Sequence, residues 1–351
     1  DKELLMSEKK IDKDKLEYLD IAKGIGIILV VFGHALTEKY AAASSFWFVL
    51  RRAVYFTHMS IFFIISGFLF EYKKDSYSKK GFGQFFTKKA TVYLVPYVFF
   101  SVLILLILRL ASLVGIGGIF DNVNILSSNW LDNLLMIITF EHHPDNHLWF
   151  IYVMFVVLMI GFWIKKLPLL PFIILFYLFY AATWFFDFPE VVWKVMRYLF
   201  LFQIGRIIRQ RDKWIKKANI ILLIIVWVIG LIGMLHFSTA DNYRFQAVIR
   251  PFVEVSGALI VLKISLFLTT YRRAGKAVEV LKKLGQNSYP IYLIHQPYIV
   301  PIVLFIIERI GLPIFCNILI ATFIGLAVPL LLYKLIIKRC KILNLLVTGN
   351  H

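Results

Sequence analysis

The stretch IAKGIGIILVVFGHAL, residues 21–36, is almost wholly apolar, yet it carries Lys23 near its start and His34 deep inside it. A block of this length and composition predicts a membrane-spanning helix, because about 20 apolar residues cross the core of a bilayer. An ionisable side chain inside such a helix is costly to bury and is a candidate functional residue by default. The stretch therefore predicts a membrane fold and its first candidate site.

The same pattern recurs along the whole chain, which has 351 residues, 60% of them hydrophobic. Soluble domains are closer to half apolar, and the excess here lies in long blocks rather than in alternations. We therefore expect an all-α polytopic membrane protein with about ten transmembrane helices. The expected spans are 21–37, 53–71, 91–113, 148–164, 169–186, 193–209, 218–236, 250–269, 288–308 and 312–334.

The polar segments divide the chain into three expected parts. These are a charged cytoplasmic N-terminal segment (1–18), one integral membrane domain (19–338) and a short cytoplasmic tail (339–351). The apolar stretch 125–140 carries Asp132 and Asn133, so we expect an interfacial or re-entrant helix there, with an eleventh span as the alternative. The two cysteines, Cys316 and Cys340, indicate neither a disulfide framework nor a metal site.

Lysine and arginine gather in alternate joints between the expected spans, and the loop 114–147 contains none. This bias places both termini in the cytoplasm by the positive-inside rule. Topology and attraction to anionic lipid account for most of the net charge of +18, so nucleic-acid binding is not required. The basic joints are KK at 73–74, 79–80, 88–89, 165–166 and 282–283, RIIRQRDKWIKK at 206–217, RR at 272–273 and KRCK at 338–341.

Lys23 and His34 lie on one face of the first expected helix. They are eleven residues apart, three turns plus about 20°, and so roughly 16 Å apart along the axis. This geometry suits a charge that holds one end of a long ligand and a base that meets the other end. A lysine that reaches to the membrane interface and a structural histidine are the alternative.

Further ionisable side chains fall at a similar depth in the outer half of other spans. His58 enters on the second span, His147 and Trp149 open the fourth, and Arg250 and Glu254 open the eighth. Several ionisable groups at one depth indicate a central polar cavity.

The ninth span reads NSYPIYLIHQP at residues 287–297 and places His295 about two turns from its cytoplasmic end. Pro290 and Pro297 should distort this helix. A broken helix exposes carbonyl groups, which are tolerated where they line a cavity.

Four motifs occur in order: LDIAKGIGIILVVFGHAL (19–36), FTHMSIFFIISGFLF (56–70), HLWFIYVMF (147–155) and LGQNSYPIYLIHQP (284–297). Together they resemble the membrane-bound acyltransferase-3 family, and among its branches the fucose 4-O-acetylase and related acetyltransferases. That family carries Arg or Lys, ten residues and then His, which Lys23 and His34 match. One departure is FTKKATVYLVPY (86–97), where Lys88 and Lys89 stand in place of arginines and so lack the bidentate guanidinium fork.

The resemblance implies a bacterial plasma-membrane enzyme that uses cytosolic acyl-CoA, acetyl-CoA first, to O-acylate a cell-surface or lipid-linked glycan. Its implied partners are membrane lipid, acyl-CoA and the glycan acceptor, without a metal. His34 would be the general base, with Glu254 or its rival Glu38 orienting it. Direct transfer and a transient acyl-His34 both stay open. The implied residues are His34, Glu254 and His58 for catalysis, Lys23, Lys88, Lys89 and His295 for acyl-CoA, and His147, Trp149 and Arg250 for the acceptor.

A transporter or flippase of a lipid-linked glycan is the main alternative, because it would also combine many spans with a polar cavity. Transporters often contain inverted repeats, and no such repeat is visible in the sequence. A membrane-embedded sensor or scaffold is a third reading, in which the site residues would be incidental.

Overall fold

The computed structural model describes residues 16–113, 129–140, 143, 145–237, 243–271 and 275–349, and every regular element within them is helical. Most of the expected N-terminal segment, and residues 125–128 of the expected interfacial helix, lie outside this part of the chain. The rest of that stretch forms α6, Trp130–Thr139. The fold class predicted from composition is thus confirmed.

Seven helical segments in the described residues are long and apolar enough to cross a membrane, and two shorter apolar helices, α8 (Leu169–Ala182) and α11 (Ile220–His236), accompany them. The expected count of ten spans and their orientation stay predictions. The seven are α2 (Glu17–Ala35), α4 (Ser45–Tyr72), α5 (Lys74–Leu113), η3 with α7 (Asn146–Leu148, Trp149–Trp163), η4 with α12 (Tyr243–Phe245, Gln246–Tyr271), the segment of α14, α15 and η6 (Ser288–Ile310), and α16 with η7 (Ile314–Leu335, Ile337–Arg339).

Several helices extend beyond the apolar blocks that predicted them. The α4 helix begins at Ser45 rather than near residue 53, and α5 begins at Lys74 rather than near residue 91, with a kink at Gly81 (φ 75°). Hydropathy marks where a helix would meet lipid, whereas a backbone hydrogen-bond ladder continues through charged residues of good helix propensity. The sequence therefore predicts the spans better than it predicts the ends of the helices.

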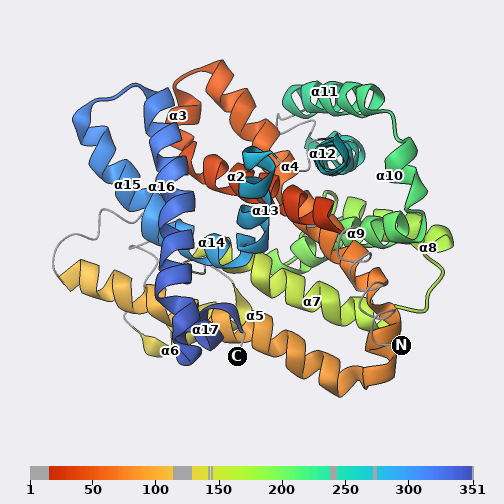
Figure 1. Cartoon of the computed structure of the whole chain (residues 1–351), viewed down its shortest axis with the longest axis horizontal. Helices are drawn as coiled ribbons and strands as arrows, with labels where there is room; N and C mark the ends of the chain where they lie inside the picture. The colour runs from red at the N-terminus through yellow and green to blue at the C-terminus, as the bar shows by residue number, and fades with distance from the viewer. Residues whose placement is uncertain are drawn as a thin grey trace.

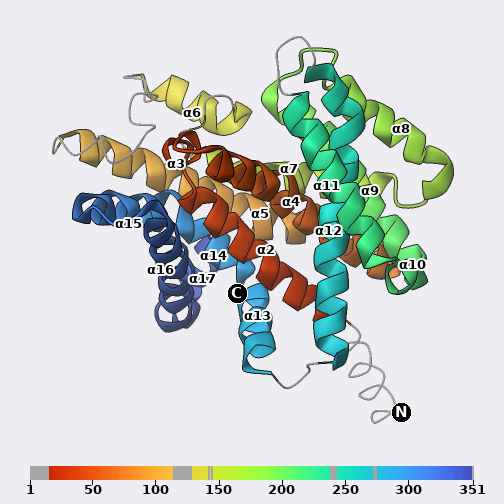
Figure 2. The ribbon, with the colours of Figure 1, turned by 90° about the horizontal axis from the view of Figure 1, so that it is seen from above.

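The α2 helix lies in the interior of the bundle, against α4, α12, α16 and α13 (Lys276–Gln286) (Figures 1 and 2). Its contact with α13 depends on glycine, since a Cβ atom on Gly24 would lie 2.0 Å from the carbonyl oxygen of Leu281. Small residues allow such backbone contact between membrane helices. This contact fixes the Lys23 end of α2 beside α13.

The α4 helix crosses α9 (Glu190–Gln210) in the same way. A Cβ atom on Gly205 would lie 2.0 Å from the carbonyl oxygen of Ile64. Beside this crossing, the fully buried Arg206 donates to the Glu71 carboxylate at 2.8 Å and to the Lys165 carbonyl at 2.9 Å. Arg206 therefore joins three segments of the bundle, and its charge is balanced inside the protein.

The ninth expected span is broken, as its prolines predict. The α14 helix (Ser288–Ile294) passes into a π-helical turn, His295–Ile299, in which Gln296 has non-helical dihedral angles, and α15 (Val300–Ile307) follows. Such turns occur frequently at functional sites. Here the break lies at His295, one of the candidate site residues.

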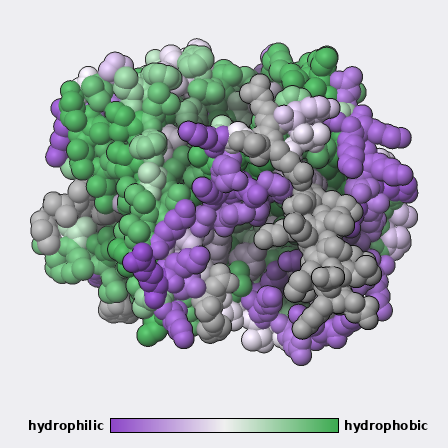
Figure 3. Space-filling model, in the orientation of Figure 1, coloured by the Kyte–Doolittle hydropathy of each residue, from purple (hydrophilic) through white to green (hydrophobic). Residues whose placement is uncertain are grey.

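The expected C-terminal tail forms a helix that packs on the bundle. This helix, α17 (Lys341–Thr348), contacts α5 and ends at Gly349, which has a φ of 67° and lies against the backbone of Thr91. Figure 3 shows the surface of the bundle, where apolar residues cover the area over α15 and α16 and hydrophilic residues form a band beside it. An apolar outer surface of this kind suits contact with lipid.

Candidate functional site

A cavity of about 320 Å³ contains His34, and we call it the histidine cavity. Helices from distant parts of the chain supply its walls, and the π-helical turn after α14 closes one side. Its lining residues are His34, Arg51, Tyr55, Asp145, Asn146, His147, Trp149, Lys194, Gln296 and Pro297.

Three imidazole rings lie in a row at this cavity. The ring centroid of His34 is 5.2 Å from that of His295, which is 5.6 Å from that of His147. His295 belongs to the broken helix and is fully buried. The structure thus brings together three of the sequence-predicted residues, although His295 was expected nearer the acyl-CoA side.

Asp145 holds His147 in place, and the sequence reasoning did not single it out. Its side chain is 2% exposed, and its carboxylate accepts a hydrogen bond from Nδ1 of His147. Burial raises the pKa of Asp145, while the nearby His147 opposes that rise. The short spacing Asp-x-His directly before the HLWF motif is the signal that would have found this pair.

Four buried acceptor atoms of this site have no hydrogen-bond partner among the described residues. They are Oδ2 of Asp145, Nε2 of His147, Nε2 of His295 and Oε1 of Gln296. Both ring nitrogens are acceptors because Nδ1 of each histidine already donates, in His295 to the Tyr292 carbonyl at 2.7 Å. An unsatisfied buried polar group is destabilising, and three of the four residues concerned, Asp145, His147 and Gln296, line the cavity.

Two cations, Arg51 and Lys194, and two aromatic rings, Tyr55 and Trp149, line the cavity. The Arg51 guanidinium donates to the Leu36 carbonyl at 3.1 Å and to the Glu38 carboxylate at 3.0 Å. Lys194 Nζ lies 4.8 Å from the ring centroid of Trp149. The ring of Tyr198 stacks on Trp149 at 4.9 Å between centroids, and Glu38 pairs with Arg51.

Of the residues predicted for catalysis or for the acceptor, His58, Glu254 and Arg250 do not line the histidine cavity. His58 donates through Nδ1 to the Val54 carbonyl at 2.8 Å. Glu254 accepts from Arg250 Nε at 2.7 Å and from the Tyr180 hydroxyl at 3.0 Å. Glu254 thus pairs with the arginine four residues away, and the carboxylate that contacts a histidine of the cavity is Asp145, on His147.

A second cavity, of about 280 Å³, lies on the other side of Tyr292, and we call it the tyrosine cavity. Tyr292 lines it and donates through its hydroxyl to the backbone carbonyl of His147. The ring of Tyr292 lies 5.1 Å from that of Phe150, which lines the same cavity. Other lining residues include Lys23, Ser66, Tyr93, Gln286, Tyr289 and, from the C-terminal helix α17, Thr348.

Basic side chains gather at the Lys23 end of the tyrosine cavity. Partial desolvation, and then the charges of Lys88 and Lys23, lower the pKa of the exposed Lys73, so these three lysines are near enough to interact electrostatically. Lys23 also pairs with Asp20 at 2.6 Å. Lys89 lies over the rings of Tyr77 and Phe85, and of the lysines expected at the acyl-CoA site only Lys23 lines the cavity among the described residues.

A family model described as an acyltransferase domain matches residues 16–334, which include every residue that lines the histidine cavity. Among curated proteins, the Nodulation protein NolL of Mesorhizobium japonicum is 36% identical over 87 residues, which is 24% of this chain and 22% of that protein. The chain thus aligns with well under two thirds of that relative. No solved structure matches the chain. In the described residues, no group of three or more His, Cys, Asp or Glu is arranged to hold a metal ion.

Proposed function

Because the chain belongs to the acyltransferase domain family, we propose that this membrane acyltransferase moves an acyl group from acyl-CoA to a hydroxyl group of a glycan. Acetyl is the acyl group we propose first, since the four sequence motifs resemble those of the fucose 4-O-acetylase branch. The acceptor is a cell-surface or lipid-linked glycan of the bacterial envelope.

The observation that carries this proposal is that three residues with an unpartnered buried acceptor, Asp145, His147 and Gln296, line the cavity that contains His34. A sugar offers several hydroxyl donors at fixed spacing, and it can satisfy such a set while one further hydroxyl meets His34. A site built to bind hydroxyl groups also discriminates strongly against analogues that lack them, because its buried polar groups would then stay unpaired.

We propose that His34 is the general base. A ring nitrogen of neutral His34 takes the proton of the acceptor hydroxyl as its oxygen attacks the thioester carbonyl carbon. The carbon–sulfur bond then breaks, and the thiolate of CoA receives the proton from the imidazolium. His147, held by Asp145, accepts a hydrogen bond from the acceptor and positions it at His34.

The tyrosine cavity is the proposed site for the thioester arm of the donor. The lysine cluster of Lys23, Lys73 and Lys88 lies at one end, where it would attract the phosphates of CoA. Tyr292 lies at the other end, against His147. Lys23 and His34 are eleven residues apart on α2, so donor phosphates and reacting carbonyl would lie roughly 16 Å apart along that helix.

The proposal is tested by incubating purified protein with radiolabelled acetyl-CoA and a panel of glycans. We expect label on a glycan, and His34→Ala should lower turnover by about 10²–10⁴-fold, the usual contribution of a general base. His236→Ala is the matched control, because His236 lies at the end of α11 against Phe237. A His34→Ala variant that keeps more than about a tenth of the wild-type turnover would remove His34 from this role.

A further inference from the structure

The C-terminal helix α17 reaches the tyrosine cavity, although it lies beyond residue 334, where the match to the acyltransferase domain ends. Thr348, in the last turn of α17, lines the cavity together with Lys23 and Tyr289. Thr348 is buried, and its hydroxyl donates to the Asn344 carbonyl at 2.8 Å. A residue outside the matched domain therefore forms part of the wall of the proposed donor site.

Backbone contact at Gly349 fixes the end of α17 against α5. The chain leaves α17 at Gly349 with a φ of 67°, which favours glycine. A Cβ atom on Gly349 would lie 2.2 Å from the carbonyl oxygen of Thr91 and 2.4 Å from the Cα atom of Val92. The Val92 carbonyl accepts from the Tyr289 hydroxyl of α14 at 2.7 Å, and both residues line the cavity. Three segments, α5, α14 and α17, thus meet at this wall.

This wall lies at the lysine end of the tyrosine cavity. Val92 follows Lys88 of the lysine cluster by four residues, about one turn of α5, and Lys23 of the same cluster lines the cavity. The basic joints predict that this end faces the cytoplasm. A donor with its phosphates at the lysine cluster and its thioester near Tyr292 would therefore cross the part of the cavity that Thr348 lines.

We propose that α17 is part of the acyl-CoA site and that Thr348 contacts the pantetheine arm of the donor. This inference rests on the proposed function, because it takes the tyrosine cavity as the donor site. The pantetheine arm is a narrow chain, so the bulk of the side chain at residue 348 determines whether the arm can enter. Thr348 is thereby a residue for donor binding and takes no part in proton transfer.

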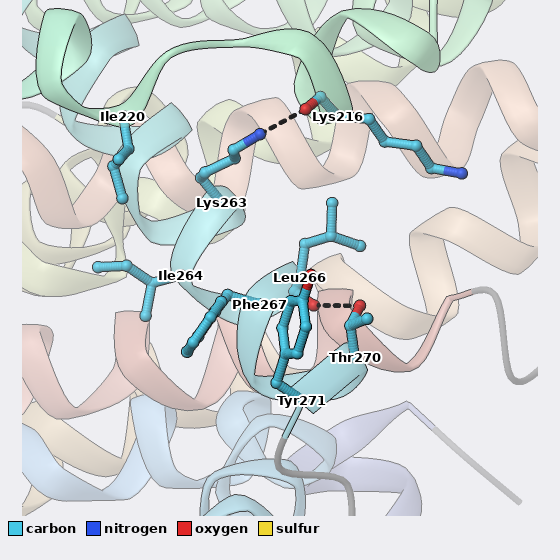
Figure 4. Close-up of a pocket in the computed structure, with 8 residues that line it drawn as sticks. All are labelled: Lys216, Ile220, Lys263, Ile264, Leu266, Phe267, Thr270 and Tyr271. Atoms are coloured by element: carbon cyan, nitrogen blue, oxygen red, sulfur yellow. Dashed lines mark hydrogen bonds between the residues drawn. The ribbon is translucent and has the colours of Figure 1, made fainter.

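A groove elsewhere on the molecule provides a matched control position. The groove has a volume of about 610 Å³, lies between α10 (Lys213–Lys217) and the last turns of α12, and shares no lining residue with the tyrosine cavity. Thr270 lines it, and the Thr270 hydroxyl donates to the Leu266 carbonyl at 2.9 Å (Figure 4). Thr270 and Thr348 thus each donate to the carbonyl four residues earlier, on the walls of two separate cavities.

The test is the affinity of the purified full chain for desulfo-CoA, measured by calorimetry. Desulfo-CoA carries the phosphates and most of the pantetheine arm but has no thioester to react. Thr348→Trp should weaken its binding by about tenfold or more, because the indole ring would occupy the space of the arm. Thr348→Ser keeps the hydroxyl and leaves this space open, so its affinity should stay within about twofold of wild type. Thr270→Trp makes the larger change in the groove and should also stay within about twofold.

Gly349→Ala tests the position of the helix separately from the Thr348 side chain. Its Cβ atom would meet the backbone of α5, so α17 should shift and the affinity for desulfo-CoA should fall by about fivefold or more. Gly311→Ala is the matched control, because Gly311 has a φ of 75° and nothing lies within 4 Å of its added Cβ. It carries the same left-handed strain without the collision, and its affinity should match that of wild type.

Unchanged affinity for desulfo-CoA in Thr348→Trp would overturn the inference. Equal losses in Thr348→Trp and Thr270→Trp would also overturn it, because the effect would then belong to the fold as a whole. If Thr348→Trp does not fold, as judged by thermal unfolding in detergent, the difference between Gly349→Ala and Gly311→Ala decides. A wild-type protein that does not bind desulfo-CoA would instead contradict the proposed function, and the inference would fall with it.

Discussion

Asp145 determines which ring nitrogen of His147 is left without a hydrogen bond among the described residues. Because the carboxylate accepts from Nδ1, Nε2 is left free at the cavity. If the two residues act as one unit, Asp145→Asn and His147→Ala should each lower kcat by about 10²-fold or more. The double variant should be no slower than His147→Ala, since residues that act as a unit are non-additive. Steady-state kinetics with a saturating donor checks this.

Glu254→Gln is the comparison for Asp145→Asn. It removes a buried charge that contacts Arg250 and Tyr180 rather than the histidine cavity. Its effect should therefore appear as a lower melting temperature, with kcat within about threefold of wild type, because only the partner of a buried charge is removed. The proposed role of Asp145 would be contradicted if the losses of kcat from the two single variants added up in the double variant of Asp145 and His147. It would also be contradicted if kcat collapsed in Glu254→Gln.

If the lysine cluster binds the donor, the affinity for the donor should depend on pH, and the charge of Lys73 sets the direction of that change. The pKa of this exposed lysine is lowered by partial desolvation and then by Lys88 and Lys23, so Lys73 loses its charge at a lower pH than an ordinary lysine does. If the charge binds donor phosphates, affinity for desulfo-CoA should fall as the pH rises through that lowered pKa. Lys73→Arg stays charged throughout, so its affinity should be flat over the same range by calorimetry. The same fall in Lys73→Arg would exclude Lys73 as its source.

The helix elements follow from the sequence more closely than the contacts between their side chains. Apolar blocks predicted the helices because both the lipid-facing surface and the core of a membrane protein are built from apolar residues. Pro297 indicated the break at His295. The row of His34, His295 and His147 was not predictable in the same way. Its members lie on elements far apart in sequence, and the tilt of the broken helix decides which rings meet. Asp145 lies in a short connection, where hydropathy carries no signal.

The close contact between α4 and α9 at Gly205 leads to a prediction about stability. A Cβ atom on Gly205 would lie 2.0 Å from a backbone oxygen of Ile64, which cannot rotate away. Gly205→Ala should therefore separate α4 from α9 and cost about 1–3 kcal/mol of folding free energy, the usual penalty of overpacking. Gly83→Ala is the control, because nothing lies within 4 Å of its added Cβ. Thermal unfolding in detergent compares the two, and equal melting temperatures would show that the crossing has room.

For the whole molecule, the two cavities and the lysine cluster imply a direction across the membrane. The basic joints predict that the Lys23 end of α2 faces the cytoplasm, where acyl-CoA is present. His34 and the connection from Leu36 to Ser44, which contains the short helix α3 (Glu38–Ala42), would then lie toward the outside, where a glycan is accessible. The orientation of the helices and the direction of acyl transfer across the membrane can therefore be tested together. The measurement is the side of the membrane on which each end of α4 lies.

We expect Ser45, exposed at the start of α4, to lie outside and Ser76, exposed just after its end, to lie in the cytoplasm. In a background with Cys316→Ser and Cys340→Ser, a membrane-impermeant maleimide added to intact cells should label the Ser45→Cys variant. It should label Ser76→Cys only after the membrane is opened, which also shows that this thiol is reactive. The reverse pattern would place the lysine cluster outside. An acyl-CoA from the cytosol would not reach it there, and the donor would have to come from another source.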